Sequence, residues 1–197
     1  DVYKRQHPYI AEKIAEQAGE LEHVAFGGFT HPPAVQLAER LVKMLPEKIK
    51  KVFFSDNGST ANEVALKMAT QYWHNKGDAR LKFIALEHDY HGDTFGSMSL
   101  TARGGFNEPF EKLMFDVEFI PAPTKENLSE VLSKVEELCS SNEYAAFVFE
   151  PLVQGAAGML MHDADGLNDL IGVCHTHGVL TIACLLYTSP SPRDRYI

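Results

Sequence analysis

The sequence contains little cysteine and no long apolar run, and these two absences exclude several classes of protein. Its 197 residues include three cysteines, Cys139, Cys174 and Cys184, an odd number without the spacing of a metal site. A disulfide-stapled scaffold is therefore excluded, and a reducing cytoplasm is the compartment that we expect. No apolar run approaches the ~18 residues that a membrane-spanning helix requires, so no membrane partner is expected.

Positive charge is also scarce, above all in the second half of the chain. The formal net charge is −9, from 18 Lys and Arg against 27 Asp and Glu. Residues 1–99 hold 12 basic and 13 acidic side chains, whereas residues 100–197 hold 6 and 14. No basic patch is available to neutralise phosphates along a nucleic acid, so no nucleic-acid partner is expected. No lysine follows Lys134, which limits the chemistry of the second half.

Hydrophobic periodicity predicts helices that alternate with short strands. The composition, 45% hydrophobic and 23% charged, is typical of a globular domain. This alternation predicts an α/β fold with a mostly parallel sheet and helices on both faces. The spacing of apolar residues predicts helices at 8–21, 32–46, 60–76, 124–138 and 167–177, and strands at 51–55, 82–86, 117–120, 145–149 and 179–183.

The two ends of the chain do not continue this pattern. Residues 184–197 carry Ser189-Pro190-Ser191-Pro192-Arg193 without periodicity, and residues 1–6 join abruptly to the first helix. Two interpretations are open: disordered termini, or stretches foreign to the gene that resemble read-through of library adapters. We favour the second interpretation and treat residues 7–183 as the native part.

The first candidate site is the turn at 57–60, between a predicted strand and a predicted helix. Gly58, Ser59 and Thr60 offer backbone N–H groups, two hydroxyls and the positive end of a helix to an anion such as phosphate. A plain helix cap is the alternative, because Thr60 and Glu63 fit a capping box unaided. A nucleoside-triphosphate loop is excluded, since no Gly-Lys-Ser/Thr follows.

Two further polar segments, 87–94 and 150–155, each follow a predicted strand. Open α/β sheets bind ligands beyond the carboxyl ends of their strands, where the ring of Tyr90 could stack on a flat cofactor and a glutamate could orient a ligand. The alternatives are a polar loop with a packed tyrosine, and a carboxylate that caps a proline turn. A zinc site that uses His88, His91 and a carboxylate is a weaker alternative.

The order of these three segments resembles the class III aminotransferases, which use pyridoxal 5'-phosphate on the fold type I architecture. The resemblance spans residues 7–183 and implies a partial, truncated cofactor-binding large domain. A further segment, Phe26-Gly27-Gly28-Phe29-Thr30-His31, and the residue Asp93 resemble the subfamily of biotin biosynthesis, which takes its amino group from S-adenosylmethionine. The three motifs are Asn57-Gly58-Ser59-Thr60-Ala61-Asn62-Glu63, Tyr90-His91-Gly92-Asp93-Thr94 and Glu150-Pro151-Leu152-Val153-Gln154-Gly155.

The resemblance also implies roles for single residues, small-molecule substrates and a homodimer. Tyr90 and Asp93 would contact the substrate. The residues implied to bind the cofactor are Gly58, Ser59, Thr60, Tyr90, His91, Gly92 and Glu150.

The chain departs from the family after its last predicted strand. In the family, an aspartate follows this strand and pairs with the pyridine nitrogen of the cofactor, and a later lysine forms the Schiff base. Here Cys184 follows Ala183, and no lysine follows Lys134. The resemblance therefore assigns no catalytic residue to this chain, and we expect the chain by itself to be inactive.

Three other functions stay open from the sequence. One is a class III enzyme that acts on ornithine, acetylornithine or 4-aminobutyrate, against which Asp93 argues. Another is a non-enzymatic binding domain on the same fold, because a fold alone does not determine a function. The third is a zinc hydrolase.

Overall fold

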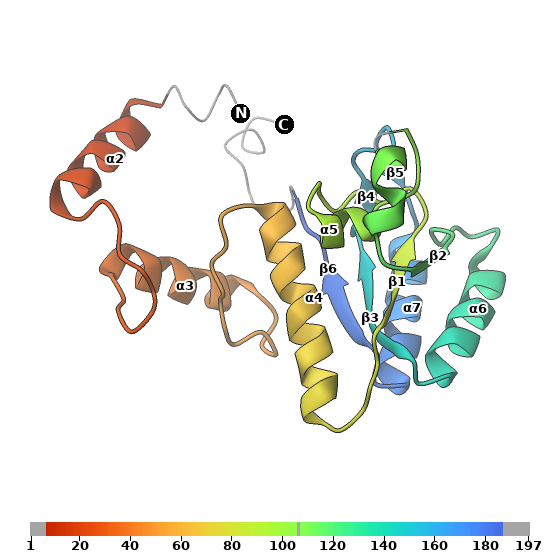
Figure 1. Cartoon of the computed structure of the whole chain (residues 1–197). Helices are drawn as coiled ribbons and strands as arrows, with labels where there is room; N and C mark the ends of the chain where they lie inside the picture. Colours follow the sequence, from red (N-terminus) through yellow and green to blue (C-terminus); the bar gives the residue numbers. More distant parts are fainter. Residues whose placement is uncertain (1–6, 106, 187–197) are drawn as a thin grey trace. The chain divides into compact units, whose positions relative to one another are not determined.

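The computed structural model describes residues 7–105 and 107–186, which belong to two compact units that divide between Phe54 and Ser55 (Figure 1). Residues 1–6, predicted to be foreign to the gene, and 187–197, which make up most of the predicted foreign tail, lie outside the described residues. Within the described ranges, no helix combines the length and the apolar character needed to cross a bilayer.

The first unit contains two helices, α2 (Pro8–Glu20) and α3 (Pro32–Met44), each introduced by proline. Proline suits the first helical turn because its missing N–H would have no partner there. Both predicted helices are confirmed. The predicted strand at 51–55 is wrong, because this segment pairs with no strand in the described part of the chain, and its Phe53 is 65% exposed.

The second unit is built on a parallel sheet whose strands lie in the order β2-β1-β3-β6 (Figure 1). All six residues of the central strand β3 are buried, as expected of a parallel strand that is covered on both faces. Each of the four strands that the sequence predicts in this unit is confirmed to within one residue. Their bounds are Lys82–Leu86 (β1), Val117–Ile120 (β2), Tyr144–Phe149 (β3) and Leu180–Ala183 (β6).

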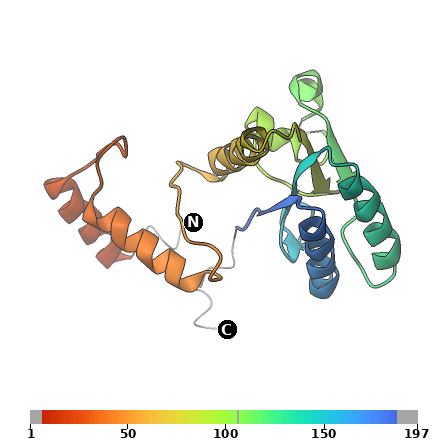
Figure 2. The ribbon, with the colours of Figure 1, turned by 90° about the horizontal axis from the view of Figure 1, so that it is seen from below.

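Helices cover both faces of this sheet (Figure 2). The helix α4 (Gly58–Asn75) packs on one face, and α6 (Leu128–Ser140) and α7 (Ala164–Thr176) pack on the other. Successive strand residues point to opposite faces, so Ile84 joins the α6–α7 side while its neighbour Phe83 joins the α4 side.

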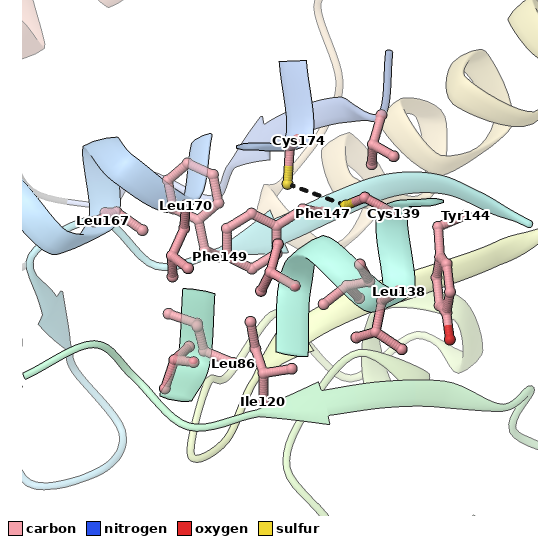
Figure 3. Close-up of a cluster of buried hydrophobic side chains, with 14 residues drawn as sticks. Leu86, Ile120, Leu138, Cys139, Tyr144, Phe147, Phe149, Leu167, Leu170 and Cys174 are labelled. Atoms are coloured by element: carbon pink, nitrogen blue, oxygen red, sulfur yellow. Dashed lines mark hydrogen bonds between the residues drawn. The ribbon is translucent and has the colours of Figure 1, made fainter. Parts of the chain in front are cut away.

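The core between the sheet and the α6–α7 layer is mainly aliphatic and includes the aromatic side chains of Tyr144, Phe147 and Phe149 (Figure 3). Phe147 and Phe149, two residues apart in β3, both lie on this face of the strand, with their ring centroids 4.9 Å apart. Cys139 of α6 and Cys174 of α7 also lie in this core, with their sulfur atoms 3.9 Å apart (Figure 3). Both are free thiols, so packing rather than a covalent bridge holds the two helices together.

The structure corrects the predicted cap of α4. Asn57 is the N-cap residue: its Oδ1 accepts from the N–H of Thr60 at 3.0 Å, and Thr60 Oγ1 accepts from the N–H of Asn57 at 3.2 Å. Glu63 takes no part in this box. Its carboxylate accepts instead from the N–H groups of Gly96 and Ser97, at the positive end of the short helix α5 (Phe95–Ser99).

Several short elements follow the strands, and the sequence did not predict them. They are too brief for a periodic pattern. Besides α5, they are the 3-10 helix η1 (Glu108–Leu113) and an antiparallel hairpin of β4 (Val153–Gln154) and β5 (Leu160–Met161). Long-range hydrogen bonds hold two of them: Gly96 and Ser97 of α5 donate to Glu63, and Gln154 of β4 donates to the Glu87 carbonyl.

Candidate functional site

The three predicted motifs meet at one edge of the sheet. The segments 87–94 and 150–155 follow β1 and β3, which are neighbouring parallel strands, so both segments leave the sheet at its carboxyl edge. The turn at 57–60 joins them through Ser59, whose Oγ accepts from the N–H of Asp93 at 3.2 Å. Residues distant in sequence thus form one site.

The start of α4 offers hydrogen-bond donors to an anion. The first N–H groups of a helix have no intrahelical partner, and Asn57 takes only that of Thr60. The N–H groups of Gly58 and Ser59 therefore remain as donors, next to the Ser59 hydroxyl. The Thr60 hydroxyl is engaged within the turn, where it accepts from Ser55 Oγ at 2.6 Å. The two interpretations are therefore compatible: Asn57 and Thr60 cap the helix, whereas Gly58 and Ser59 offer donors to an anion.

Tyr90 presents a partly exposed ring, 41% accessible, beside this turn. Its backbone N–H donates to Glu150 Oε1 at 2.8 Å, and its hydroxyl donates to Asp93 Oδ2 at 2.9 Å. Burial, with a further contribution from the Asp93 carboxylate, raises the pKa of the Tyr90 phenol. The hydroxyl is therefore protonated at neutral pH, and the exposed ring can stack on a flat ligand.

Gly92 lets the segment 87–94, which we call the Tyr90 loop, approach α4 closely. Its φ is +125°, which favours glycine, and a Cβ built there would overlap the Ser59 hydroxyl and lie 3.0 Å from Ser59 Cα. The contact between Ser59 and Asp93 therefore depends on a residue without a side chain at this position.

His91 points into the protein and supports the loop from beneath, with only 3% of its surface exposed. The backbone N–H of His91 donates to Thr101 Oγ1 at 3.0 Å, and its backbone carbonyl accepts from Asn62 Nδ2 at 2.7 Å. Burial lowers the pKa of His91, but Asp89, whose Oδ2 lies 3.3 Å from Nε2, and Cys184 raise it to about 9.

Glu150 uses both of its carboxylate oxygens to hold backbone groups. Oε1 accepts from Tyr90, and Oε2 accepts from the N–H of Gly155 at 2.9 Å. Behind it, the fully buried Gln154 donates to Asp89 Oδ1 at 2.7 Å and to the Glu87 carbonyl at 2.6 Å. Glu150 therefore acts on the site indirectly, by holding the backbone of Tyr90 and of Gly155 in place.

Sequence reasoning missed three residues that hold the site together: Asn62, Asp89 and Gln154. Their only signal was a polar side chain inside or next to a recognised motif. Their partners come from segments 29 to 67 residues away, which local spacing cannot reveal.

Cys184 occupies the position where the resemblance expects an aspartate. Its sulfur accepts from Asn62 Nδ2 at 3.3 Å, at the end of β6 and close to His91. Nowhere in residues 7–105 and 107–186 do three His, Cys, Asp or Glu side chains gather to hold a metal ion, so the zinc alternative gains no support.

Comparison with known proteins gives the class. The pattern of the aminotransferase class-III family matches residues 5–184, and the chain belongs to this family. A curated relative from Synechococcus elongatus, adenosylmethionine-8-amino-7-oxononanoate aminotransferase, is 48% identical over 191 residues, which cover 93% of this chain and 45% of the relative. The Staphylococcus aureus protein of the same name is 33% identical and is covered to 44%. The chain thus spans less than half the length of these relatives.

Solved structures of transaminases share the fold. The adenosylmethionine-8-amino-7-oxononanoate aminotransferase of Methanocaldococcus jannaschii matches with a TM-score of 0.83 and 32% identity, over 90% of this chain and 41% of that one. An amine transaminase from an uncultivated Pseudomonas species, in a form with bound pyridoxal phosphate, matches with a TM-score of 0.84 and 32% identity, over 91% and 44%. The predicted fold type I architecture is confirmed.

Proposed function

We propose that the chain is the cofactor-binding part of a pyridoxal-phosphate transaminase of biotin biosynthesis. The complete enzyme would transfer an amino group from S-adenosylmethionine to 8-amino-7-oxononanoate and give 7,8-diaminononanoate. The observation that carries the proposal is the junction of the three motifs, through the Ser59–Asp93 and Tyr90–Glu150 hydrogen bonds. The names of the curated relatives support the choice of substrates.

The residues at this junction fit both ends of the cofactor. Gly58 and Ser59 would hold the phosphate at the positive end of α4, through their N–H groups and the Ser59 hydroxyl. Thr60, which the resemblance also implies as a ligand, would act indirectly, because Asn57 takes its N–H and its hydroxyl is engaged within the turn. The exposed Tyr90 ring would lie against the pyridine ring.

The remaining site residues would act through the Tyr90 loop and on the substrate. His91, Gly92 and Glu150 would keep the loop in place, since each is buried, closely packed or bonded to its backbone. Bound pyridoxal phosphate supplies the electron sink for amino transfer. The Asp93 carboxylate, held by the Tyr90 hydroxyl, would face the substrate and attract its amino group.

Two features of this chain set it apart from a complete enzyme. A thiol, Cys184, stands at the end of β6, and no lysine follows Lys134. We therefore expect non-covalent cofactor binding without turnover. For the complete enzyme we propose a cytoplasmic homodimer that acts on small molecules, with neither nucleic acid nor membrane as a partner.

Titration of the purified chain with pyridoxal phosphate, followed by absorbance, tests the cofactor. Saturable binding without consumption of S-adenosylmethionine is expected, and turnover by this chain would contradict the proposal. The substrate is tested with the full-length gene product. Amino transfer from S-adenosylmethionine is expected there, whereas a preference for ornithine, acetylornithine or 4-aminobutyrate would assign it to another branch of the class.

A further inference from the structure

We propose that Asp89 is a positioning residue, whose buried carboxylate fixes the Tyr90 loop in the orientation that the flat ring of a bound cofactor requires. Its effect on ligand binding rests on the proposed function, whereas its effect on the order of the loop does not. Asp89 immediately precedes Tyr90, but its own side chain points away from solvent and is fully buried.

A buried carboxylate must be compensated by its surroundings, because it loses its hydration. The N–H of Glu150 donates to Oδ2 at 3.0 Å, and Gln154 Nε2 donates to Oδ1 at 2.7 Å. His91 Nε2 lies 3.3 Å from Oδ2, and the pKa of this imidazole is raised to about 9, so it adds a positive charge at neutral pH. Every one of these groups belongs to one of the two loops at the sheet edge.

The contacts of Asp89 and Glu150 are reciprocal. The Asp89 side chain accepts from the backbone of Glu150, and the Glu150 side chain accepts from the backbone of Tyr90 at 2.8 Å. We call the closed ring formed by Asp89, Tyr90 and Glu150 the carboxylate clasp. It joins the ends of β1 and β3 across 60 residues of sequence, as a capping box joins the ends of one helical turn.

The carboxylate clasp holds one end of the proposed site only. It fixes the backbone from which the Tyr90 ring projects, whereas the phosphate end consists of the first turn of α4 and includes no residue of the clasp. Loss of the clasp should therefore weaken contacts with the pyridine ring and leave phosphate contacts intact. A merely structural residue would weaken both ends together.

The variant Asp89→Asn tests this separation in the purified chain. The amide replaces one acceptor with a donor, so it cannot accept from both Glu150 and Gln154. We expect the Kd for pyridoxal phosphate to rise about tenfold, the effect of one buried charge-assisted hydrogen bond, while the Kd for inorganic phosphate stays the same. The matched control is Asp163→Asn, which makes the same substitution at the N-cap residue of α7; asparagine keeps an acceptor there for the N–H of Gly166, whose nitrogen lies 2.8 Å from Asp163 Oδ2.

An unchanged Kd for pyridoxal phosphate in folded Asp89→Asn would overturn the proposal. So would a parallel rise in the Kd values of Asp89→Asn for pyridoxal phosphate and for inorganic phosphate, since this is the behaviour of general destabilisation. If Asp89→Asn does not fold, Gln154→Met, which removes only the bonds to Asp89 and Glu87, takes its place with a smaller expected rise.

Amide hydrogen exchange measured by NMR tests the carboxylate clasp without any ligand. We expect the N–H groups of Tyr90 and Glu150 to exchange faster in Asp89→Asn than in the parent and in Asp163→Asn. Equal exchange rates would overturn the positioning role even if the cofactor binds. If the parent chain binds no pyridoxal phosphate, the proposed function fails, and these exchange rates alone decide the role of Asp89.

Discussion

At the scale of single residues, the site is held by side chains that each bind the backbone of another segment. Ser59 accepts from Asp93, Glu150 accepts from Tyr90, and Asn62 donates to His91. A side chain that holds a backbone group constrains the loop on either side of that group, so the loss of one hydrogen bond affects more than the bonded pair.

The variant Ser59→Ala tests the phosphate end of the site. It removes the acceptor for the N–H of Asp93 and one hydroxyl donor toward the proposed phosphate. We expect the Kd for pyridoxal phosphate to rise about tenfold and the free energy of unfolding to fall by about 1 kcal/mol. Calorimetry and urea denaturation measure the two quantities. Ser133→Ala, which removes an exposed bond within α6, is the control, and an equal effect of both variants would contradict the assignment.

The stability of the chain should depend on pH through His91. Its pKa is raised from 6.5 to about 9 in the folded chain, despite the opposing effect of burial, because Asp89 and Cys184 favour the charged form. The folded state therefore binds more protons than the unfolded state between these values, and the free energy of unfolding decreases as the pH rises from 6.5 to 9. Urea denaturation across this range should show the slope in the parent and in His23→Gln, but a smaller slope in His91→Gln. Identical slopes in all three would refute this origin.

At the scale of elements, the loops at the sheet edge depend on close approach to α4. Gly92 and Gly96 both leave no room for a Cβ, which would meet Ser59 and the Glu63 carboxylate respectively. The Tyr90 loop and α5 are therefore packed against α4 as tightly as the backbone permits.

The variant Gly92→Ala tests this packing. The added Cβ overlaps Ser59, and the positive φ disfavours alanine, so we expect the free energy of unfolding to fall by about 1–3 kcal/mol and cofactor binding to weaken. Gly172→Ala in α7 is the matched control: its Cβ meets no atom within 4 Å, and alanine is expected to stabilise the helix by up to about 1 kcal/mol. Thermal denaturation of both variants should show shifts of opposite sign, and equal destabilisation would contradict the model of close packing.

How far the sequence predicts the fold can be judged element by element. The strands of the sheet and the long helices carry apolar patterns of their own, so their positions could be predicted. The run at 51–55 has the same apolar character, but among residues 7–105 and 107–186 no neighbouring strand takes its backbone hydrogen bonds, and the sequence does not show which runs find one. The helix α5 depends on Glu63, which lies 33 residues from Gly96.

The candidate site divides in the same way. Ser59, Tyr90 and Glu150 stand in recognisable motifs, and the structure brings them together. Asp89 could not be assigned a role, because an aspartate next to a motif has the same appearance whether it is solvated or buried. Only the burial and the three partners of its carboxylate distinguish the two cases.

At the scale of the whole molecule, the first unit exposes many apolar side chains. Ile14, Phe29, Met44 and Phe53 are each at least 65% exposed. Exposed apolar surface of this kind favours association, in agreement with the proposed homodimer of the complete enzyme.

We therefore expect the purified chain to associate as its concentration rises, which sedimentation velocity measures. The double variant Met44→Gln and Phe53→Gln should shift the distribution toward the monomer, because it removes apolar surface from the first unit. Leu81→Gln, at a residue of the second unit that is also 65% exposed, is the control. A monomer at every concentration, or an equal effect of the control, would exclude the first unit as the associating surface.

The hydrogen bonds that join the three motifs also determine at which stage of folding the site can form. They link residues 34 positions apart for Ser59 and Asp93, and 60 apart for Tyr90 and Glu150. Contacts of such separation form late, because the entropy of closing long loops must be overcome first. During synthesis, the backbone of Tyr90 therefore lacks its bond to Glu150 until Glu150 has left the ribosome and β3 has joined β1. The residues that bind Asp93 and His91 are made earlier: Ser59, Asn62 and Thr101. The chain length at which a nascent chain first binds a ligand would therefore show when β3 pairs with β1.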